Sequence, residues 1–360
     1  MGALEHWEDF EARRAEWSAL AGEAGNLFAT WEWADAWRRH AGATGIAHVF
    51  AVRDGSGRLT AILPLWLTAI RGLRLLRFIG HDGGDHLGPI HVAGAEHAAA
   101  GGLIRALDEL TPAWDILLAE NLPGPTRWEH LLGAGTLRRD STASVPIDGQ
   151  TWSDYLAHRS GRLRRLRTYE RRLAREHAVR YRLADSPERL HHDLDVLFAL
   201  HAMRWGAHSP GLGPARRAFH GEFAARALER GWLRLWFLEV DGSPVAAWYG
   251  FRFGGAEWAY QGGRDPAWDR ASVGSLLLAH TLREAFADEQ REYKMLRGNE
   301  GYKQRFASEA GEVVTLVRGR GIRGRAAARL AAEAAQRAVV ARTLRRSLGR
   351  TRWRALGGAG

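Results

Sequence analysis

The strongest constraint on the fold is the order of elements that hydrophobic periodicity predicts between residues 179 and 317. A strand is followed by two helices, three strands, a helix, a strand, a helical turn and a last strand. Their expected bounds are Val179–Leu183, Pro187–Arg204, Pro214–Arg230, Leu233–Val240, Val245–Phe253, Glu257–Gln261, Ser272–Asp288, Tyr293–Arg297, Tyr302–Ala307 and Glu312–Val317. A meander that feeds a helix, with another strand behind that helix, leaves a cleft where neighbouring strands can diverge. The order therefore predicts an α/β unit with a cleft beside a helix for which Ser272 is a suitable N-cap.

The start of that helix has a composition suited to an anion. Arg270 supplies a cation, and Ser272, Gly274 and Ser275 are small enough to let a phosphate approach the backbone. The free N–H groups and the positive dipole end of a helix favour a diphosphate at such a place. Many ordinary helices also begin with serine and glycine, so the spacing alone does not separate this site from a structural helix start.

Three segments of the second half carry a family resemblance: Tyr260–Pro266, the helix opening at Gly274, and Arg297–Phe306. Together they resemble the GNAT-type acetyltransferase domain of the CelD/BcsL group, which is related to the FemAB aminoacyltransferases. Looser matches are Phe28, Trp33, Trp37, Ile62–Leu65, Asp85, Gly88–Ile90, Arg204–Trp205 and Gly231–Leu233. The resemblance covers residues 28–317, and its most specific part is Gly298–Phe306.

This resemblance implies direct transfer of an acyl group from acyl-CoA to an amine or hydroxyl, often in polysaccharide or envelope pathways. The acceptor would be a small molecule or glycan, acetyl-CoA would be the co-substrate, and no cofactor would be tightly bound. By resemblance, the donor is held by Tyr260, Gln261, Gly262, Arg270, Ser272, Val273, Gly274 and Ser275. The implied catalytic residues are Glu300 as acceptor base, Tyr302 as acid for the thiolate, and Lys303; the implied acceptor residues are Asp85, Arg204, Trp205 and Asn299.

The residues themselves leave other interpretations of these positions open. Glu300 also suits a carboxylate that a helix dipole stabilises, and Tyr302 also suits a packing residue with a bonded hydroxyl. Lys303 is one of only two lysines among 51 basic side chains, which favours a specific contact, although Lys294 carries no motif. The usual GNAT phosphate signature is altered, because Asp269 and Ser272 occupy two of its key positions if Gly274 is its last glycine.

The first half alternates helix and strand signals less regularly. Trp33 and Trp37 lie four residues apart and predict a buried helix stripe. Strands are expected at 48–53, 59–67, 73–79 and 115–119, and a helix at 96–110. Ala51–Ser56 recurs in kind as Leu238–Ser243, which favours two related halves. We therefore predict an α/β fold with mixed sheets: tandem GNAT-like domains at 1–150 and 179–318, an Arg-rich connecting helix at 151–178 and a basic helical tail at 319–360.

The positive charge of the chain is concentrated at its end. The formal net charge is +10, and from Gly319 to Gly360 eleven arginines face one acid, Glu333, so the remaining residues are neutral overall. The tail could meet an anionic membrane surface, an acidic partner or nucleic acid, but its many alanines favour a solvated extension. A neutral body argues against nucleic-acid binding. The Arg-dense segment 159–175, with Leu163 and Leu173 at helical spacing, predicts an amphipathic helix whose arginines face solvent and could alternatively meet phosphate.

Several classes of protein are disfavoured by composition. The absence of cysteine excludes disulfides, thiolate metal sites and a cysteine nucleophile. No stretch is apolar and long enough for a membrane span, and no signal peptide is recognisable, so a cytoplasmic protein is expected. His81–His86 holds two histidines and two aspartates, but its glycines favour a polar loop near the acceptor cleft over a metal site. Two alternatives stay open: a FemAB-like aminoacyltransferase that uses aminoacyl-tRNA, and a silent scaffold.

Overall fold

The computed structural model describes residues 2–337 apart from residues 41, 43, 111, 160, 207–211, 214–215, 299 and 308. Asn299 and residues 338–360 of the basic tail lie outside the described residues. The first half consists of β1 (Ala3–Trp7), α1 (Arg14–Ala24), η1 (Leu27–Ala29), α2 (Trp31–His40), β2 (Ile46–Arg53), β3 (Leu59–Ile70), β4 (Leu73–Phe78), β5 (Ile90–His91), α3 (Glu96–Glu109), β6 (Ile116–Pro123), α4 (Trp128–Leu131) and β7 (Gly135–Pro146).

The second half has the predicted order of elements after three short connecting helices. These helices are α5 (Trp152–Ala157), α6 (Gly161–Arg164) and α7 (Leu166–Glu176). The rest consists of β8 (Val179–Leu183), α8 (Pro187–Trp205), α9 (Arg217–Glu229), β9 (Leu233–Val240), β10 (Ser243–Phe253), β11 (Ala256–Arg264), η3 (Pro266–Ala271), α10 (Val273–Ala287), β12 (Glu292–Arg297), α11 (Lys303–Phe306) and β13 (Glu309–Gly319). A further helix spans residues 321–337.

Some predicted details were wrong. The single helix expected over 159–175 is two helices, α6 and α7, that meet at Arg165. The sequence analysis missed β1, α1 and the long strand β7, whose half-buried pattern lacks a clear alternation. Ser272 does precede α10, but it adopts a left-handed conformation with φ 58° and its hydroxyl makes no capping hydrogen bond.

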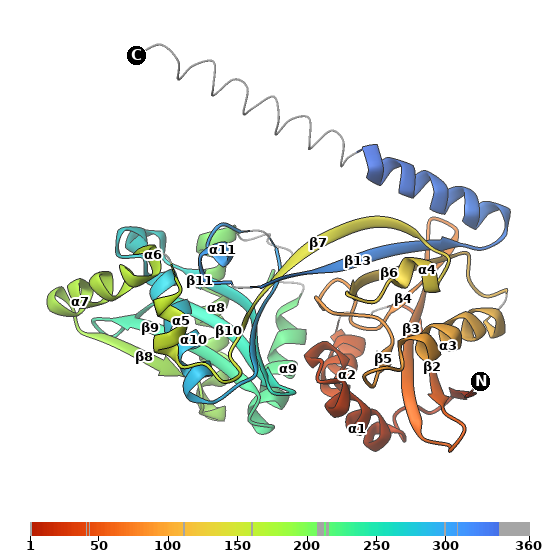
Figure 1. Cartoon of the computed structure of the whole chain (residues 1–360), viewed down its shortest axis with the longest axis horizontal. Helices are drawn as coiled ribbons and strands as arrows, with labels where there is room; N and C mark the ends of the chain where they lie inside the picture. The colour runs from red at the N-terminus through yellow and green to blue at the C-terminus, as the bar shows by residue number, and fades with distance from the viewer. Residues whose placement is uncertain are drawn as a thin grey trace, which may run out of the picture.

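One continuous mixed sheet runs through both halves. Its strand order is β1-β2-β3-β4-β6-β13-β7-β12-β11-β10-β9-β8, with β5 paired to β3. The last strand, β13, lies between β6 and β7, and β7 in turn pairs with β12 of the second half. In Figure 1 the long strands β7 and β13 pass together from one half to the other. The predicted α/β fold with mixed sheets is confirmed, while the division at 150, 178 and 318 stays a prediction.

Helices cover both faces of the second-half sheet. Alternate residues of β10 point to opposite sides: Tyr249 and Phe251 join the core under α8 and α9, whereas Trp248 joins the core under α10. The first core also contains Trp33 and Trp37 of α2, so it continues across the junction of the halves. Both tryptophans are buried, as their spacing predicted. None of the described helices is both long and apolar enough to cross a membrane.

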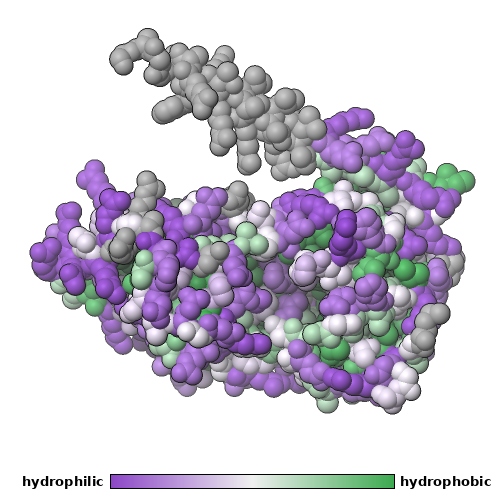
Figure 2. All heavy atoms as spheres, in the orientation of Figure 1, coloured by the Kyte–Doolittle hydropathy of each residue, from purple (hydrophilic) through white to green (hydrophobic). Residues whose placement is uncertain are grey.

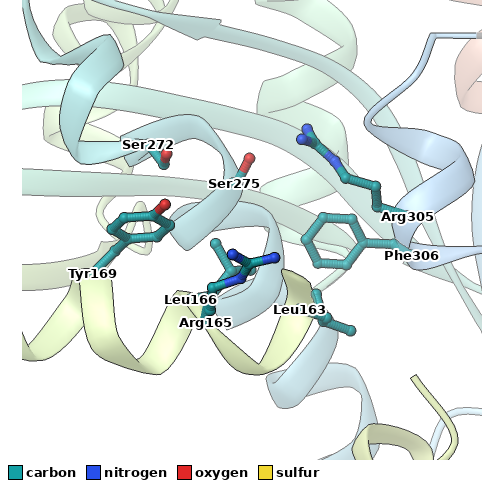
Figure 3. Close-up of a pocket in the computed structure, with 8 residues that line it drawn as sticks. All are labelled: Leu163, Arg165, Leu166, Tyr169, Ser272, Ser275, Arg305 and Phe306. Atoms are coloured by element: carbon teal, nitrogen blue, oxygen red, sulfur yellow. The ribbon is translucent and has the colours of Figure 1, made fainter. Parts of the chain in front are cut away.

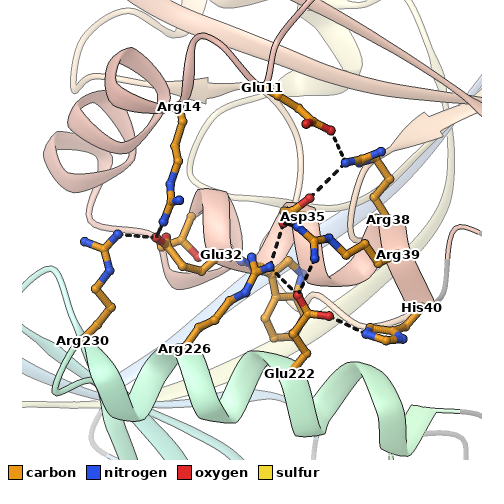
Figure 4. A network of polar contacts seen from close by, with 12 residues as sticks. Glu11, Arg14, Glu32, Asp35, Arg38, Arg39, His40, Glu222, Arg226 and Arg230 are labelled. Carbon is orange, nitrogen blue, oxygen red and sulfur yellow. Dashed lines mark hydrogen bonds and ion pairs between the residues drawn. The ribbon is translucent and has the colours of Figure 1, made fainter.

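A network of ion pairs joins α2 of the first half to α9 of the second (Figure 4). The buried carboxylate of Glu32 binds Arg230 at 2.8 Å and Arg14 at 3.3 Å. The buried carboxylate of Asp35 binds Arg226 at 2.8 Å and its own helix neighbour Arg39 at 2.9 Å. Because each buried charge is paired across the junction, the network fixes one half against the other.

Candidate active site

The strands β11 and β12 part at the place where the sequence predicted a cleft. They run parallel and pair at only three positions, from Ala256 with Glu292 to Trp258 with Lys294. Beyond that point β11 continues along β10 as far as Arg264, while β12 continues along β7 to Arg297. The edge of β11 that faces β12 is therefore outside the ladder after Trp258, and such an edge leaves backbone groups available to a ligand.

A β-bulge interrupts β11 at the start of this free edge. Tyr249 of β10 is paired with Gln261 and Gly250 with Ala259, so Tyr260 is the extra residue. The Tyr260 hydroxyl donates to the carbonyl of Gly83 at 2.9 Å, which ties it to the first half. The carbonyl of Gly262 accepts from Trp205 Nε1 at 3.2 Å. Of the implied donor-arm residues, Tyr260 and Gly262 thus already have partners for the hydroxyl and the carbonyl, and Gln261 lies half-buried between them.

A pocket of about 310 Å³ lies at the start of α10 (Figure 3). It is lined by Leu163, Arg165, Leu166, Tyr169, Ser272, Ser275, Arg305 and Phe306. Figure 3 shows the Arg305 guanidinium extending beside the Ser275 hydroxyl, and the Tyr169 hydroxyl directed towards Ser272. Two guanidinium groups and three hydroxyls around the positive end of a helix dipole form a site suited to a diphosphate.

The other residues implied for the diphosphate lie differently. Val273 is fully buried in the core, and Gly274 packs so closely that a Cβ there would lie 3.1 Å from Arg264 Cδ. Arg270 is exposed on η3 and is not among the residues that line the pocket. Asp269, the acid at a key position of the altered signature, is paired with Arg264 at 2.6 Å. Its negative charge is therefore balanced before a phosphate arrives.

The implied catalytic and acceptor residues meet near the end of α8. The Arg204 guanidinium lies 4.4 Å from the ring centre of Trp205 and 5.3 Å from that of Tyr302. Burial raises the pKa of the Tyr302 hydroxyl to about 12, and the negative charge of Glu300 adds to this effect. Trp205 keeps 46% of its surface exposed, so one aromatic face beside this cluster remains open to a substrate.

Lys303 lies inside the protein next to this cluster. Its ammonium donates to the carbonyl of Arg297 at 2.5 Å and pairs with the Glu300 carboxylate at 3.1 Å. Only 8% of its side chain is exposed. Lys303 therefore holds Glu300 at the end of β12, whereas a direct contact with substrate would require it to leave these partners.

Asp85 reaches the same region from the first half. Its carboxylate accepts from the backbone N–H of Arg297 at 3.3 Å and pairs with the Arg297 guanidinium at 3.3 Å. Burial raises the pKa of Asp85, and the positive charge of Arg297 opposes that rise. A carboxylate that is buried and only partly compensated is a common feature of functional sites.

The loop His81–His86, which carries Asp85, is held by side chains that donate hydrogen bonds to its backbone carbonyls. The carbonyl of His81 accepts from Trp37 Nε1 at 2.9 Å, and that of Gly84 accepts from Asn121 Nδ2 at 2.9 Å. Burial lowers the pKa of His81 to about 4 and that of His86 to about 3, so both imidazoles are neutral near pH 7. Within the described part of the chain no group of His, Asp and Glu has an arrangement that could hold a metal ion. The loop thus joins the two halves beside the parted strands.

Sequence reasoning missed three polar residues of the pocket: Arg165, Tyr169 and Arg305. The helical spacing of Leu163 and Leu173 was recognised, but the arginines between them were assigned chiefly to solvent. Their position opposite α10 depends on the packing of α7 against that helix, which local periodicity does not encode.

Comparison with known proteins agrees with this geometry. Residues 160–304 match a family model described as "Acetyltransferase (GNAT) domain". No curated protein matches the sequence. Among solved structures, the chain is similar to FemX, with 12% identity, a TM-score of 0.62 and coverage of 84% of this chain and 95% of that one.

Two further structures have a similar fold. One is the C-terminal domain of a putative lysylphosphatidylglycerol synthetase from Agrobacterium fabrum, with 12% identity, a TM-score of 0.57 and coverage of 91% and 96%. The other is L-PGS from Bacillus licheniformis, with 13% identity, a TM-score of 0.53 and coverage of 90% and 96%. Identities this low establish the fold alone. The family match covers residues 160–304 and indicates a GNAT acetyltransferase domain there, as expected of a transferase, and the solved structures share the fold.

Proposed function

We propose that the protein transfers an acyl group, most simply acetyl, from acyl-CoA to an amine or hydroxyl acceptor at the gap between β11 and β12. The observation that carries this proposal is the pocket at the start of α10, the helix that follows β11 in the chain. Arg165 and Arg305 would bind the diphosphate of the donor, and the free edge of β11 would hold its extended arm. The chain's resemblance to the CelD/BcsL group supports a glycan or other envelope component as acceptor.

The cluster at the end of α8 supplies groups for the transfer itself. The acceptor nitrogen or oxygen would attack the thioester carbonyl carbon, and the carbon–sulfur bond would break. Glu300 would take the proton from the acceptor. Lys303, whose ammonium lies 3.1 Å from the Glu300 carboxylate, would hold that carboxylate in place. Tyr302, whose pKa of about 12 keeps its hydroxyl protonated at neutral pH, would give a proton to the leaving thiolate. Backbone N–H groups near the bulge at Tyr260 would polarise the carbonyl.

Aminoacyl-tRNA is the second candidate donor. Two observations support it: the fold is similar to that of FemX, and the sequence resembles a group related to the FemAB aminoacyltransferases. Two features favour acyl-CoA. The pocket is small and has two guanidinium groups, which matches one diphosphate, and the sequence up to residue 318 has no net charge with which to hold a long polyanion.

Calorimetric titration of the full chain with CoA and with bulk tRNA separates these donors. We expect CoA to bind, and the double variant Arg165→Ala/Arg305→Ala to bind it at least about tenfold more weakly, because each charged hydrogen bond contributes about 1.5–3 kcal/mol. Arg167→Ala is the matched control, since Arg167 is an exposed arginine of α7 outside the pocket. Equal CoA affinity in the double variant would contradict the assigned diphosphate site. Binding of tRNA without CoA would instead support the FemAB-like function, and binding of neither would support a scaffold.

A further inference from the structure

Two elements at the outer end of the first half meet at Asp115. The hairpin tip between β3 and β4 is fixed there because the Arg74 backbone N–H donates to the Asp115 carboxylate at 2.8 Å and the Arg74 guanidinium binds it at 3.0 Å. The helix 321–337 is fixed at the same residue, since the Arg320 N–H donates to the Asp115 carbonyl at 2.8 Å. A Cβ at Gly324 would lie only 2.1 Å from that carbonyl oxygen, so only glycine permits this approach. In Figure 1 this helix lies over the outer end of the first half.

Large apolar side chains are exposed on both of these elements. Ile322 is 84% exposed and Leu330 is 66% exposed on the helix, and Ile70 is 50% exposed at the hairpin tip. Figure 2 shows hydrophobic surface at the outer end of the helix, surrounded by hydrophilic residues. A single exposed isoleucine is ordinary, but three large apolar residues on two elements joined at one point form a candidate contact surface.

The charged groups around these apolar residues are mainly basic. Arg71 at the hairpin tip and Arg323, Arg325 and Arg329 on the helix are exposed. Glu333 is the only acid between residues 319 and 360, and it is paired with Arg329 at 3.0 Å. The negative charge of Asp115 is balanced as well, because the Arg74 guanidinium pairs with its carboxylate at 3.0 Å. The surface is therefore net positive.

We propose that this outer patch, defined as Ile70, Arg71, Ile322, Arg323, Arg325 and Leu330, docks the protein on an anionic lipid bilayer. Protruding aliphatic side chains can enter the boundary between headgroups and acyl chains, and arginines beside them attract anionic lipid. Nucleic acid would use the arginines but gain little from the isoleucines. A second copy of the chain would bring two positive surfaces together, which charge repulsion opposes. The inference concerns location and does not depend on which donor the site uses.

Co-sedimentation of the full-length protein with lipid vesicles tests this proposal. We expect binding to vesicles of phosphatidylcholine with one third phosphatidylglycerol, no binding to phosphatidylcholine alone, and weaker binding as salt is raised. Ile70→Asp/Ile322→Asp should lower partitioning at least about tenfold, because both apolar contacts are replaced by charges that anionic lipid repels. Arg323→Glu should lower it about fivefold or more, since each arginine near the surface contributes about that factor.

Matched variants outside the patch keep the test specific. Met203→Asp changes a methionine that is 50% exposed on α8 in the second half, and Arg180→Glu changes an exposed arginine of β8; both should bind vesicles as the unchanged protein does. Equal binding of the patch and control variants would overturn the proposal. So would tight binding to RNA that ignores the isoleucines, or self-association in light scattering that Ile322→Asp abolishes.

Discussion

The two halves of the molecule have the same order of elements and differ at the corresponding gap. In the first half β4 and β6 run parallel and pair at two positions, as β11 and β12 pair at three in the second. The first gap is closed by a bidentate ion pair from strand to strand, in which Arg77 binds Glu120 with both contacts at 2.7 Å. In the second gap, none of the strands in the described residues pairs with β11 beyond Trp258 along the edge that faces β12.

The helices that follow the two gaps, α3 and α10, differ in the charge at their first turns. The helix α3 begins with Glu96, which places a carboxylate in its first turn, whereas α10 begins beside two serines and two arginines. The loop before α3 extends into the second half and carries Asp85 to Arg297. In the first half an ion pair therefore bridges the corresponding gap, and this half instead contributes Asp85 beside the proposed site of the second half.

The largest effect that tests this division is expected at Glu300. Glu300→Gln should lower kcat at least about 100-fold, because general base catalysis contributes a factor of that size or more. It should lower the unfolding free energy by no more than about 1 kcal/mol, because Glu300 is 38% exposed and Gln can still accept from Lys303. Release of the CoA thiol during turnover measures kcat.

The corresponding test in the first half is Glu120→Gln. This change should lower the unfolding free energy by about 1–3 kcal/mol, because a charge-assisted hydrogen-bonded pair is weakened, and should leave kcat unchanged. If Glu120→Gln lowered kcat as far as Glu300→Gln does, the first gap would not have a purely structural role.

A second, smaller effect is expected when a carboxylate is placed in the first turn of α10, as Glu96 is in α3. Ser275→Glu places a carboxylate in the pocket, where it should repel the diphosphate and raise KM for acyl-CoA about tenfold with little change in kcat. The reverse change, Glu96→Ser, serves as the control and should create no CoA binding in the first half, because the Arg77–Glu120 pair still closes the gap. An unchanged KM for acyl-CoA in Ser275→Glu would show that the donor does not bind at the start of α10.

Local periodicity was sufficient to predict the order of the second half, the opening beside α10 and the burial of Trp33 and Trp37. It could not predict that β13 would lie between β6 and β7, because that pairing joins residues almost 200 positions apart in the chain, such as Leu118 and Val317. It also missed Arg165 and Arg305 at the pocket, since each belongs to a segment whose packing against α10 sets its direction. The implied roles of Glu300, Tyr302 and Arg204 came from the family resemblance, and the structure brings these three side chains together without testing what each does.

The smallest effect expected is on the junction of the halves, at Asp35. Burial alone would raise the pKa of Asp35, but hydrogen bonding and the positive charges of Arg226 and Arg39 lower it below its ordinary value. A carboxyl whose pKa is lower in the folded state stabilises the protein above the unfolded-state pKa of about 3.9, and this stabilisation is lost as the pH falls through the folded-state value. Asp35→Asn should therefore lower the unfolding free energy by about 1 kcal/mol near pH 7, where Asn keeps some hydrogen bonds, and the difference should shrink as the pH falls through the folded-state pKa of Asp35. Urea unfolding of both proteins across this range measures the difference, and a difference that stayed constant with pH would show that the charge of Asp35 does not fix the two halves together.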